Sequence, residues 1–145
     1  MFDTSADAEE AFYAAFSIGR LEDMMRVWAP NDDIVCIHPG GPRLAGVQEI
    51  RRSWALIFQN SMLRTFTVRG RMVTGDGTQR VHLLEENIRI PGTAFIAPPV
   101  LATNVYRRLA QGWRMVVHHA SVAPTRLGLS EPGPERPGQP KPRIH

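Results

Sequence analysis

Cysteine, histidine and glutamate occur in this sequence where the residues alternate with a period of two. The segment IVCIHPGGPRLAG, residues 34–46, places Cys36 two residues before His38 and then reaches a turn. Residues two apart in a strand share a face, so both side chains point to the same side. The segments VHLLEENIRI and GWRMVVHHAS add Glu86 and the pair His118 and His119. Imidazoles titrate near neutral pH and an apolar pocket raises the pKa of a carboxyl, so these residues suit general acid–base chemistry.

Composition indicates one globular domain. The chain has 145 residues and one cysteine, which cannot form an internal disulfide. No run approaches the roughly 18 apolar residues of a membrane span, and the acidic start MFDTSADAEEAF lacks an apolar export signal. The net charge is +3, but the arginines are scattered and lysine occurs once, so no phosphate-binding stripe is formed. We therefore expect a cytoplasmic protein with no membrane and no nucleic-acid partner.

Three helices are predicted in the first 60 residues. Thr4 and Asp7 have the spacing of a capping box, apolar residues then repeat at helical spacing, and Gly19 is suited to a left-handed stop. The segment LEDMMRVWAP predicts a short amphipathic helix ended by Pro30. The third helix is marked by apolar residues from position 47 to Phe58 and ends near position 60.

Strands dominate the rest of the domain. After the opening strand IVCIH, four segments alternate with period two, namely TFTVRGRMVTG, TQRVHLLEENIRI, PVLATNVYRRL and WRMVVHHASVA. Helices first and strands last predict an α+β fold with a mostly antiparallel sheet. Residues 124–145 hold many prolines and little apolar periodicity, so we expect one domain over 1–123 followed by an extended or disordered tail.

The order of these segments resembles the SnoaL-like branch of the NTF2-like superfamily. The resemblance spans roughly residues 8–123 and is carried by IVCIHPGGPRLAG leading into VQEIRRSWALIF, then by EENI, ATNVY and GWRMVVHHAS. It implies a cone, in which a curved sheet wraps around three helices and leaves a pocket open at one end. The superfamily includes isomerases, dehydratases, epoxide hydrolases, cyclases and transport adaptors, so the fold alone does not select an activity.

Strand alternation then assigns faces within the cone. Cys36 and His38 point into the pocket by the resemblance. In the last strand Arg114 belongs outside, which places Trp113, Met115 and His119 inside and His118 outside.

The remaining strands are sorted in the same way. The face with Asn104 and Tyr106 is assigned inward, and Glu86 is preferred over Glu85 because Leu84 and Ile88 accompany it.

The candidate site follows from these faces. We predict His38, His119 and Glu86 as catalytic residues, and further residues as ligand-binding. The ligand-binding set is Trp28, Cys36, Trp54, Phe58, Asn104 and Tyr106. A histidine or Glu86 would move a proton beside a carbonyl while Asn104 or Tyr106 stabilises the enolate, as isomerases, cyclases and lyases require.

Other interpretations of the same residues stay open. Buried histidine and tyrosine are often core residues, and a non-catalytic ligand-binding or protein-interaction module would show the same pattern. The tyrosine–aspartate pair of ketosteroid isomerases and the aspartate–arginine–aspartate relay of epoxide hydrolases cannot be mapped onto this sequence. The Cys36-x-His38 spacing fits no metal signature, so neither a metal nor another cofactor is expected. Cys36 is interpreted as a small buried side chain rather than a nucleophile.

Two partners are expected. The first is a small apolar molecule in the pocket. The second is another copy of the chain, because Val105, Val116 and Ala120 are predicted to leave an apolar strip on the outer face of the sheet, through which a homodimer would form.

Overall fold

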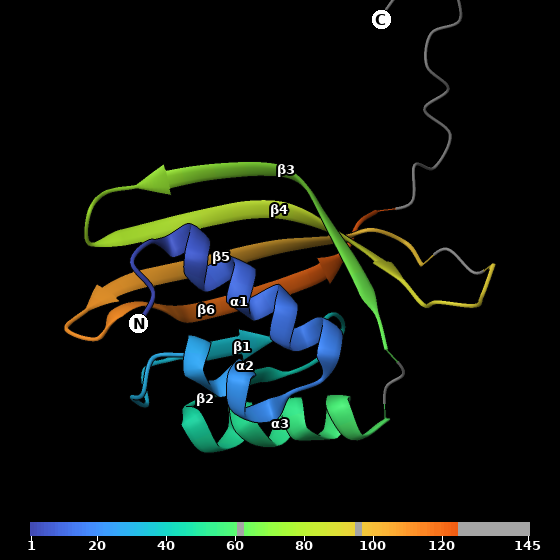
Figure 1. Ribbon diagram of the computed structural model, residues 1–145, viewed down its shortest axis with the longest axis horizontal. Helices are drawn as coiled ribbons and strands as arrows, with labels where there is room; N and C mark the ends of the chain where they lie inside the picture. The colour runs from blue at the N-terminus through green and yellow to red at the C-terminus, as the bar shows by residue number, and fades with distance from the viewer. Residues whose placement is uncertain (61–62, 95–96, 125–145) are drawn as a thin grey trace, which may run out of the picture.

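Three helices precede six strands in this computed structural model, which describes residues 1–60, 63–94 and 97–124. The helices are α1 (Ser5–Ile18), α2 (Leu21–Val27) and α3 (Val47–Asn60). The strands are β1 (Val35–Ile37), β2 (Arg43–Ala45), β3 (Thr65–Gly75), β4 (Gln79–Arg89), β5 (Val100–Leu109) and β6 (Gly112–Val122). In Figure 1, α1 crosses one face of the long strands while α2 and α3 lie at the end of the sheet that carries β1 and β2. The α+β expectation is confirmed.

Local sequence sets both ends of α1. The Thr4 hydroxyl accepts from the Asp7 N–H at 3.0 Å, and the Asp7 carboxylate accepts from the Thr4 N–H at 3.1 Å. This capping box satisfies two backbone donors that the helix itself leaves free. Gly19 ends the helix with φ 76° and donates its N–H to the Ala15 carbonyl at 2.9 Å. The predicted start and stop of this helix are therefore confirmed.

The second helix is shorter than its sequence predicts. It ends at Val27 rather than near Pro30, because Trp28 adopts an extended conformation with ψ 145°. Trp28 then forms a parallel bridge with Met115 of β6, and the Ala29 N–H donates to the Met115 carbonyl at 2.9 Å. Pairing with the sheet thus takes over from helical hydrogen bonding before the proline is reached.

The six strands form one mixed sheet in the order β2-β1-β6-β5-β4-β3. All pairs are antiparallel except β1 with β6, where Cys36 lies opposite His118. The sequence does not predict β2, a three-residue strand, or the parallel pairing. A turn around Gly40, which has φ 71°, returns the chain so that β2 can pair with β1.

A β-bulge interrupts the last strand. Val105 of β5 lies opposite Val117, but the next residue, Tyr106, lies opposite Met115, so Val116 is the extra residue in β6. One extra residue reverses the faces of all residues beyond it. Trp113 and Met115 point inward before the bulge, and His118 and Ala120 point inward after it.

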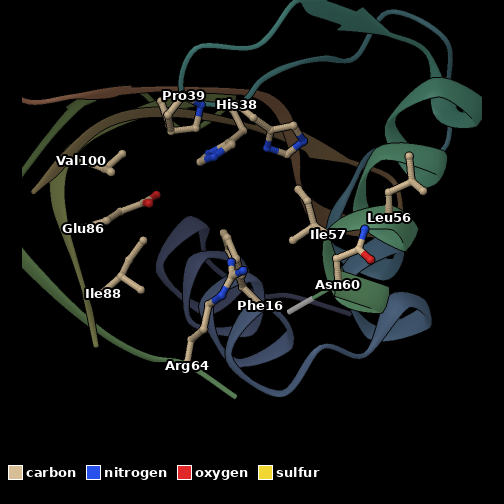
Figure 2. Close-up of a pocket in the computed structure, with 12 residues that line it drawn as sticks. Phe16, His38, Pro39, Leu56, Ile57, Asn60, Arg64, Glu86, Ile88 and Val100 are labelled. Atoms are coloured by element: carbon tan, nitrogen blue, oxygen red, sulfur yellow. The ribbon is translucent and has the colours of Figure 1, made fainter. Parts of the chain in front are cut away.

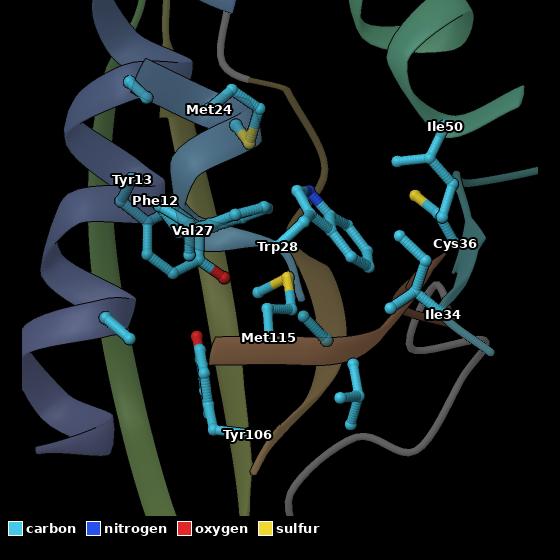
Figure 3. Close-up of a cluster of buried hydrophobic side chains, with 14 of the residues drawn as sticks. Phe12, Tyr13, Met24, Val27, Trp28, Ile34, Cys36, Ile50, Tyr106 and Met115 are labelled. Atoms are coloured by element: carbon cyan, nitrogen blue, oxygen red, sulfur yellow. The ribbon is translucent and has the colours of Figure 1, made fainter. Parts of the chain in front are cut away.

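The core lies between the helices and the inner face of the sheet. Its largest fully buried side chains include Trp28, Trp54, Tyr106 and Phe12. Figure 3 shows Phe12 from α1, Met24 from α2 and Tyr106 from β5 converging with Trp28. Burial of each such side chain contributes about 2 kcal/mol to stability.

None of the helices in the described residues is both long and apolar enough to cross a membrane. The predicted tail begins at position 124, and from residue 125 onward it lies outside the described residues.

Candidate functional site

A cavity of ≈450 Å³ opens between α1, α3 and the inner face of the sheet. Its walls are apolar where Phe16, Ile57, Ile88 and Val100 face it, and Figure 2 shows these side chains around the open space. Five polar side chains also line it, namely His38, Asn60, Arg64, Glu86 and His118. An apolar cavity with a few convergent polar groups is the usual form of a small-molecule site.

Glu86 is held at the cavity by one hydrogen bond. Its side chain comes from β4 and is 2% exposed, and Oε1 accepts from the Tyr13 hydroxyl at 2.8 Å. Burial raises its pKa to about 7, an effect that the Tyr13 hydrogen bond opposes and the negative charge of Glu9 reinforces. Within the described residues Oε2 has no hydrogen-bond partner, and Figure 2 shows the carboxyl pointing into the cavity. Glu86 can therefore take up or release a proton near neutral pH.

A chain of hydrogen bonds links Glu86 to His118. The Asn104 amide nitrogen donates to the Tyr13 hydroxyl oxygen at 3.1 Å, which leaves the Tyr13 proton for Glu86. The Asn104 carbonyl oxygen lies 2.6 Å from His118 Nδ1. A carbonyl oxygen only accepts, so His118 Nδ1 carries the proton. The network thereby fixes the orientation of each member.

His118 is a neutral imidazole. Burial lowers its pKa to about 3, with a further contribution from His38 and His119. Because Nδ1 carries the proton, Nε2 presents a lone pair, and no group in the described part of the chain hydrogen-bonds to it. The ring packs against Phe12 at 4.9 Å between centroids, and only a small part of it reaches the cavity. His118 is a fixed acceptor rather than a base.

His38 forms the neighbouring part of the wall. Its Nε2 lies 3.1 Å from the Ser53 hydroxyl oxygen and 3.6 Å from the Cys36 sulfur. Since the Ser53 hydroxyl donates to the Ile50 carbonyl at 2.8 Å, Nε2 donates to Ser53 and Nδ1 has the lone pair. Burial lowers the pKa of His38. Trp54 supports the ring edge-on at 4.9 Å between centroids.

Cys36 does not take part in the cavity. It is fully buried, and burial raises the pKa of its thiol to about 12, so it stays protonated and unreactive at neutral pH. No set of three or more His, Cys, Asp and Glu side chains in the described ranges is arranged to hold a metal ion.

Arg64 contributes a positive charge. It lies between α3 and β3 and points into the cavity in Figure 2, with its guanidinium carbon 5.6 Å from the centre of the Phe16 ring. Partial burial lowers its pKa. A partly desolvated cation over an aromatic ring is stabilised by the ring, but its charge is not neutralised.

A second buried polar cluster lies deeper along α1. Glu9 is fully buried and accepts from His82 Nδ1 at 2.9 Å, while Arg71 Nε pairs with its other oxygen at 2.6 Å. Burial raises the pKa of Glu9, but His82 and Arg71 outweigh this, so the net shift is downward. Ser5 and Tyr106 complete the cluster, at 2.9 Å from His82 and 3.4 Å from Glu9. This cluster does not line the cavity.

The structure separates the residues that the sequence groups as one site. His38 and Glu86 line the cavity, while Trp54 and Asn104 contact its lining residues from behind. Phe58 packs on Trp54 at 5.5 Å between centroids. Trp28 and Tyr106 lie in the core away from the cavity lining.

The predicted orientation of the two adjacent histidines is wrong. His119 is exposed on the outer face and His118 is buried on the inner face, because the bulge at Val116 shifts the alternation by one residue. The proposed apolar strip changes for the same reason, since Val116 and Ala120 are buried. Asn104 and Tyr106 are also wrongly assigned as enolate donors, because neither side chain lines the cavity; Asn104 donates to Tyr13 and Tyr106 to Glu9.

The sequence analysis missed Arg64 and Phe16, which line the cavity, and Tyr13, which hydrogen-bonds to Glu86. Tyr13 follows Ser5 and Glu9 at four-residue spacing, so all three share one face of α1. That spacing was a usable signal for a polar stripe. Arg64 gives no such signal, because its direction depends on how the chain enters β3.

Comparison with known proteins identifies the family. The SnoaL-like domain model matches residues 6–125, and the chain belongs to that family. Its fold is that of the NTF2-like superfamily. A Salmonella enterica protein of this superfamily is 15% identical with TM-score 0.70, over 86% of this chain and 92% of that one, which is a likeness of fold alone.

Three relatives are more similar in sequence. A Thiobacillus denitrificans structure, provisionally named a calcium/calmodulin-dependent protein kinase type II association domain, is 39% identical with TM-score 0.81, over 86% of this chain and 98% of that one. A Streptomyces avermitilis NTF2-like protein, provisionally named a dehydratase, is 34% identical with TM-score 0.72, over 81% and 92%. The F-box protein SKIP8 of Arabidopsis thaliana is 32% identical over 77% of this chain and 46% of that protein, so the chain spans about half its length.

Proposed function

We propose that this protein binds a small, largely apolar carbonyl compound in the cavity and that Glu86 moves a proton to or from it. The observation that carries the proposal is the Glu86 carboxyl, which has one oxygen held by Tyr13, the other free, and a pKa near 7. A group that titrates near the working pH is effective as both base and acid. The reaction class is that of an isomerase, cyclase or lyase. The dehydratase name of the Streptomyces avermitilis relative agrees with this class.

The roles of the other groups follow from their protonation. Ionised Glu86 removes a proton from the carbon beside the carbonyl and returns it from Oε2 in a second step. Developing negative charge on the carbonyl oxygen requires a hydrogen-bond donor, which the side-chain amide of Asn60 supplies, since it lines the cavity. His118 Nε2 and His38 Nδ1 accept hydrogen bonds and orient a donor group of the ligand.

Exchange of carbon-bound hydrogen for deuterium tests this proposal without knowledge of the natural substrate. The probe is 1-indanone in D₂O, and NMR measures loss of its α-proton signal. We expect exchange to accelerate as pH rises through about 7, and Glu86→Gln to slow it by at least roughly tenfold, since acid–base groups typically contribute more than that.

His119→Gln is the matched control, because His119 is next to His118 in sequence but lies on the outer face. It should exchange like the unaltered protein. Equal exchange in Glu86→Gln, or no exchange despite binding of 1-indanone, contradicts the catalytic proposal and favours a non-catalytic binding module.

A second role, in self-association, is favoured by the outer face of the sheet. Leu83 and Leu101 are 40% and 45% exposed there, and Val105 and Val117 are half-buried on the same face, opposite each other in register. Apolar faces of this kind are usually covered. We propose that a second copy covers it, as the association-domain name of the Thiobacillus denitrificans relative suggests for that protein. A concentration-independent mass of 16.2 kDa in light scattering would contradict the dimer.

A further inference from the structure

Arg64 is a partly buried arginine that lines the cavity and, within the described residues, has no carboxylate paired with it. Arg51 pairs with Glu22, Arg107 with Asp33 and Arg71 with Glu9. Among the described residues no carboxylate comes within ion-pair distance of Arg64, whose guanidinium group lies over the Phe16 ring instead. An arginine that is partly desolvated, directed into a cavity and unpaired lacks the anion that would stabilise it.

Glu86 does not provide that anion, although it lines the same cavity. No ion pair joins the two residues, and Arg64 is not among the groups that set the pKa of Glu86. Contact with a guanidinium would lower that pKa, whereas it is raised. The positive charge and the acid–base group therefore act on different parts of a ligand.

The imidazoles restrict the rest of the ligand. Their hydrogen bonds to Asn104 and Ser53 leave one lone pair on each ring, on His118 Nε2 and His38 Nδ1. Both nitrogens can accept a hydrogen bond but not donate one. A ligand that meets them favourably carries a hydroxyl or N–H group, and its body must suit the apolar walls formed by Ile57, Ile88 and Val100.

We infer that the ligand of this cavity is a small organic acid whose single carboxylate pairs with Arg64, with an apolar body and a hydrogen-bond donor directed to the imidazoles. This inference rests on the proposed function and adds the substrate class. A carboxylate is favoured because the planar guanidinium binds it through two parallel hydrogen bonds. Arg64 carries one positive charge, which matches the charge of one carboxylate.

A pair of probes of nearly equal shape tests the charge. 1-Naphthylacetate and its primary amide, 1-naphthylacetamide, differ in the carboxylate alone, and titration calorimetry at pH 6 and low salt gives both dissociation constants. We expect the unaltered protein to bind the acid about tenfold more tightly than the amide, a usual effect of one charge-assisted pair. Added salt should reduce this preference.

Three variants test whether Arg64 causes the preference for the acid over the amide. Arg64→Gln should abolish it while leaving the affinity for the amide within about twofold. Arg64→Lys, which keeps the charge but not the planar fork, should restore part of it. Arg52→Gln removes the same charge from an exposed position of α3 that does not line the cavity, and should keep the full preference.

The outcomes separate this inference from the proposed function. Equal binding of acid and amide to the unaltered protein, or equal loss of both in Arg64→Gln, overturns the carboxylate inference, and proton exchange of 1-indanone can still be observed. If neither probe binds and no exchange occurs, the proposed function fails and the inference fails with it.

Discussion

Glu9 and Glu86 are two buried glutamates in one core, and their surroundings differ. Glu9 has an arginine on one oxygen and a histidine on the other, and its pKa is lowered. Glu86 has only the Tyr13 hydroxyl, and its pKa is raised to about 7. A carboxylate that accepts hydrogen bonds from an arginine and a histidine stays charged and holds elements together, whereas one with a neutral hydroxyl partner and access to a cavity can exchange its proton.

The clusters share one support. Helix α1 supplies Ser5 and Glu9 to the closed cluster and Tyr13 to the open one. The sheet supplies the other members, with His82 opposite Asn104 and Asn104 opposite His118. One helix face therefore serves both stability and chemistry, and the difference between the clusters lies in which sheet residues each helix residue meets.

Loss of the charge at Glu9 should have the largest effect on stability. Glu9→Gln removes the charged acceptor of half-exposed Arg71 and of buried His82, and each hydrogen bond to a charged group contributes about 1.5–3 kcal/mol. Urea denaturation at pH 8 measures the loss. Glu86→Gln under the same conditions should be neutral or stabilising, because it removes a carboxylate that burial disfavours. Similar losses in both variants would break the distinction between the two glutamates.

The next largest effect should be a dependence of stability on pH that comes from Glu86. Its pKa rises from 4.5 to about 7 on folding, so the folded state binds the extra proton in that window and the free energy of unfolding falls as pH rises through it. The fall due to Glu86 is about 3 kcal/mol between pH 4.5 and 7, since one pKa unit is worth about 1.4 kcal/mol. Urea denaturation of Glu86→Gln should lack this fall.

His118 acts in the opposite sense in acid. Its pKa falls from 6.5 to about 3 on folding, so stability is lost as pH decreases below 6.5. Subtracting the two denaturation series cancels this contribution, because both proteins keep His118. A difference that does not vary with pH would show that Glu86 has an ordinary pKa.

Tyr13→Phe should have the smallest effect and the most specific one. It removes the hydrogen bond to Glu86 and the acceptor of Asn104, at a cost of about 1–2 kcal/mol. Because that hydrogen bond lowers the pKa of Glu86, the pH midpoint of 1-indanone exchange should move upward. Tyr106→Phe is the control, since Tyr106 contacts Glu9 instead and should leave the midpoint in place. An unmoved midpoint in Tyr13→Phe contradicts the role given to Tyr13.

The sequence predicts most elements of the fold because each carries its own signal. The Thr4 capping box, Gly19 and the helical and two-residue periods mark three helices and the four long strands. The strand β2 and the parallel partner of β1 were not predictable, since three residues carry little periodicity and pairing depends on the tertiary fold.

The site was predictable only in part. Alternation placed Glu86 and His38 correctly toward the cavity, because their strand segments are regular there. It failed for His118 and His119 because nothing in the residue types of MVVHHAS marks Val116 as the bulge. The pairing of Tyr13 with Glu86 spans 73 positions and comes from packing alone.

The bulge at Val116 also decides how this cavity could be redesigned. A mutant library that follows strict alternation from Met115 would vary positions 117, 119 and 121, and so place its diversity on the outer surface. Varying 118 and 120 reaches the cavity wall instead. Deleting the single codon for Val116 would remove the bulge and keep His118 and Ala120 on the inner side, because Met115 and Val117 would then follow each other in regular alternation opposite Tyr106 and Val105.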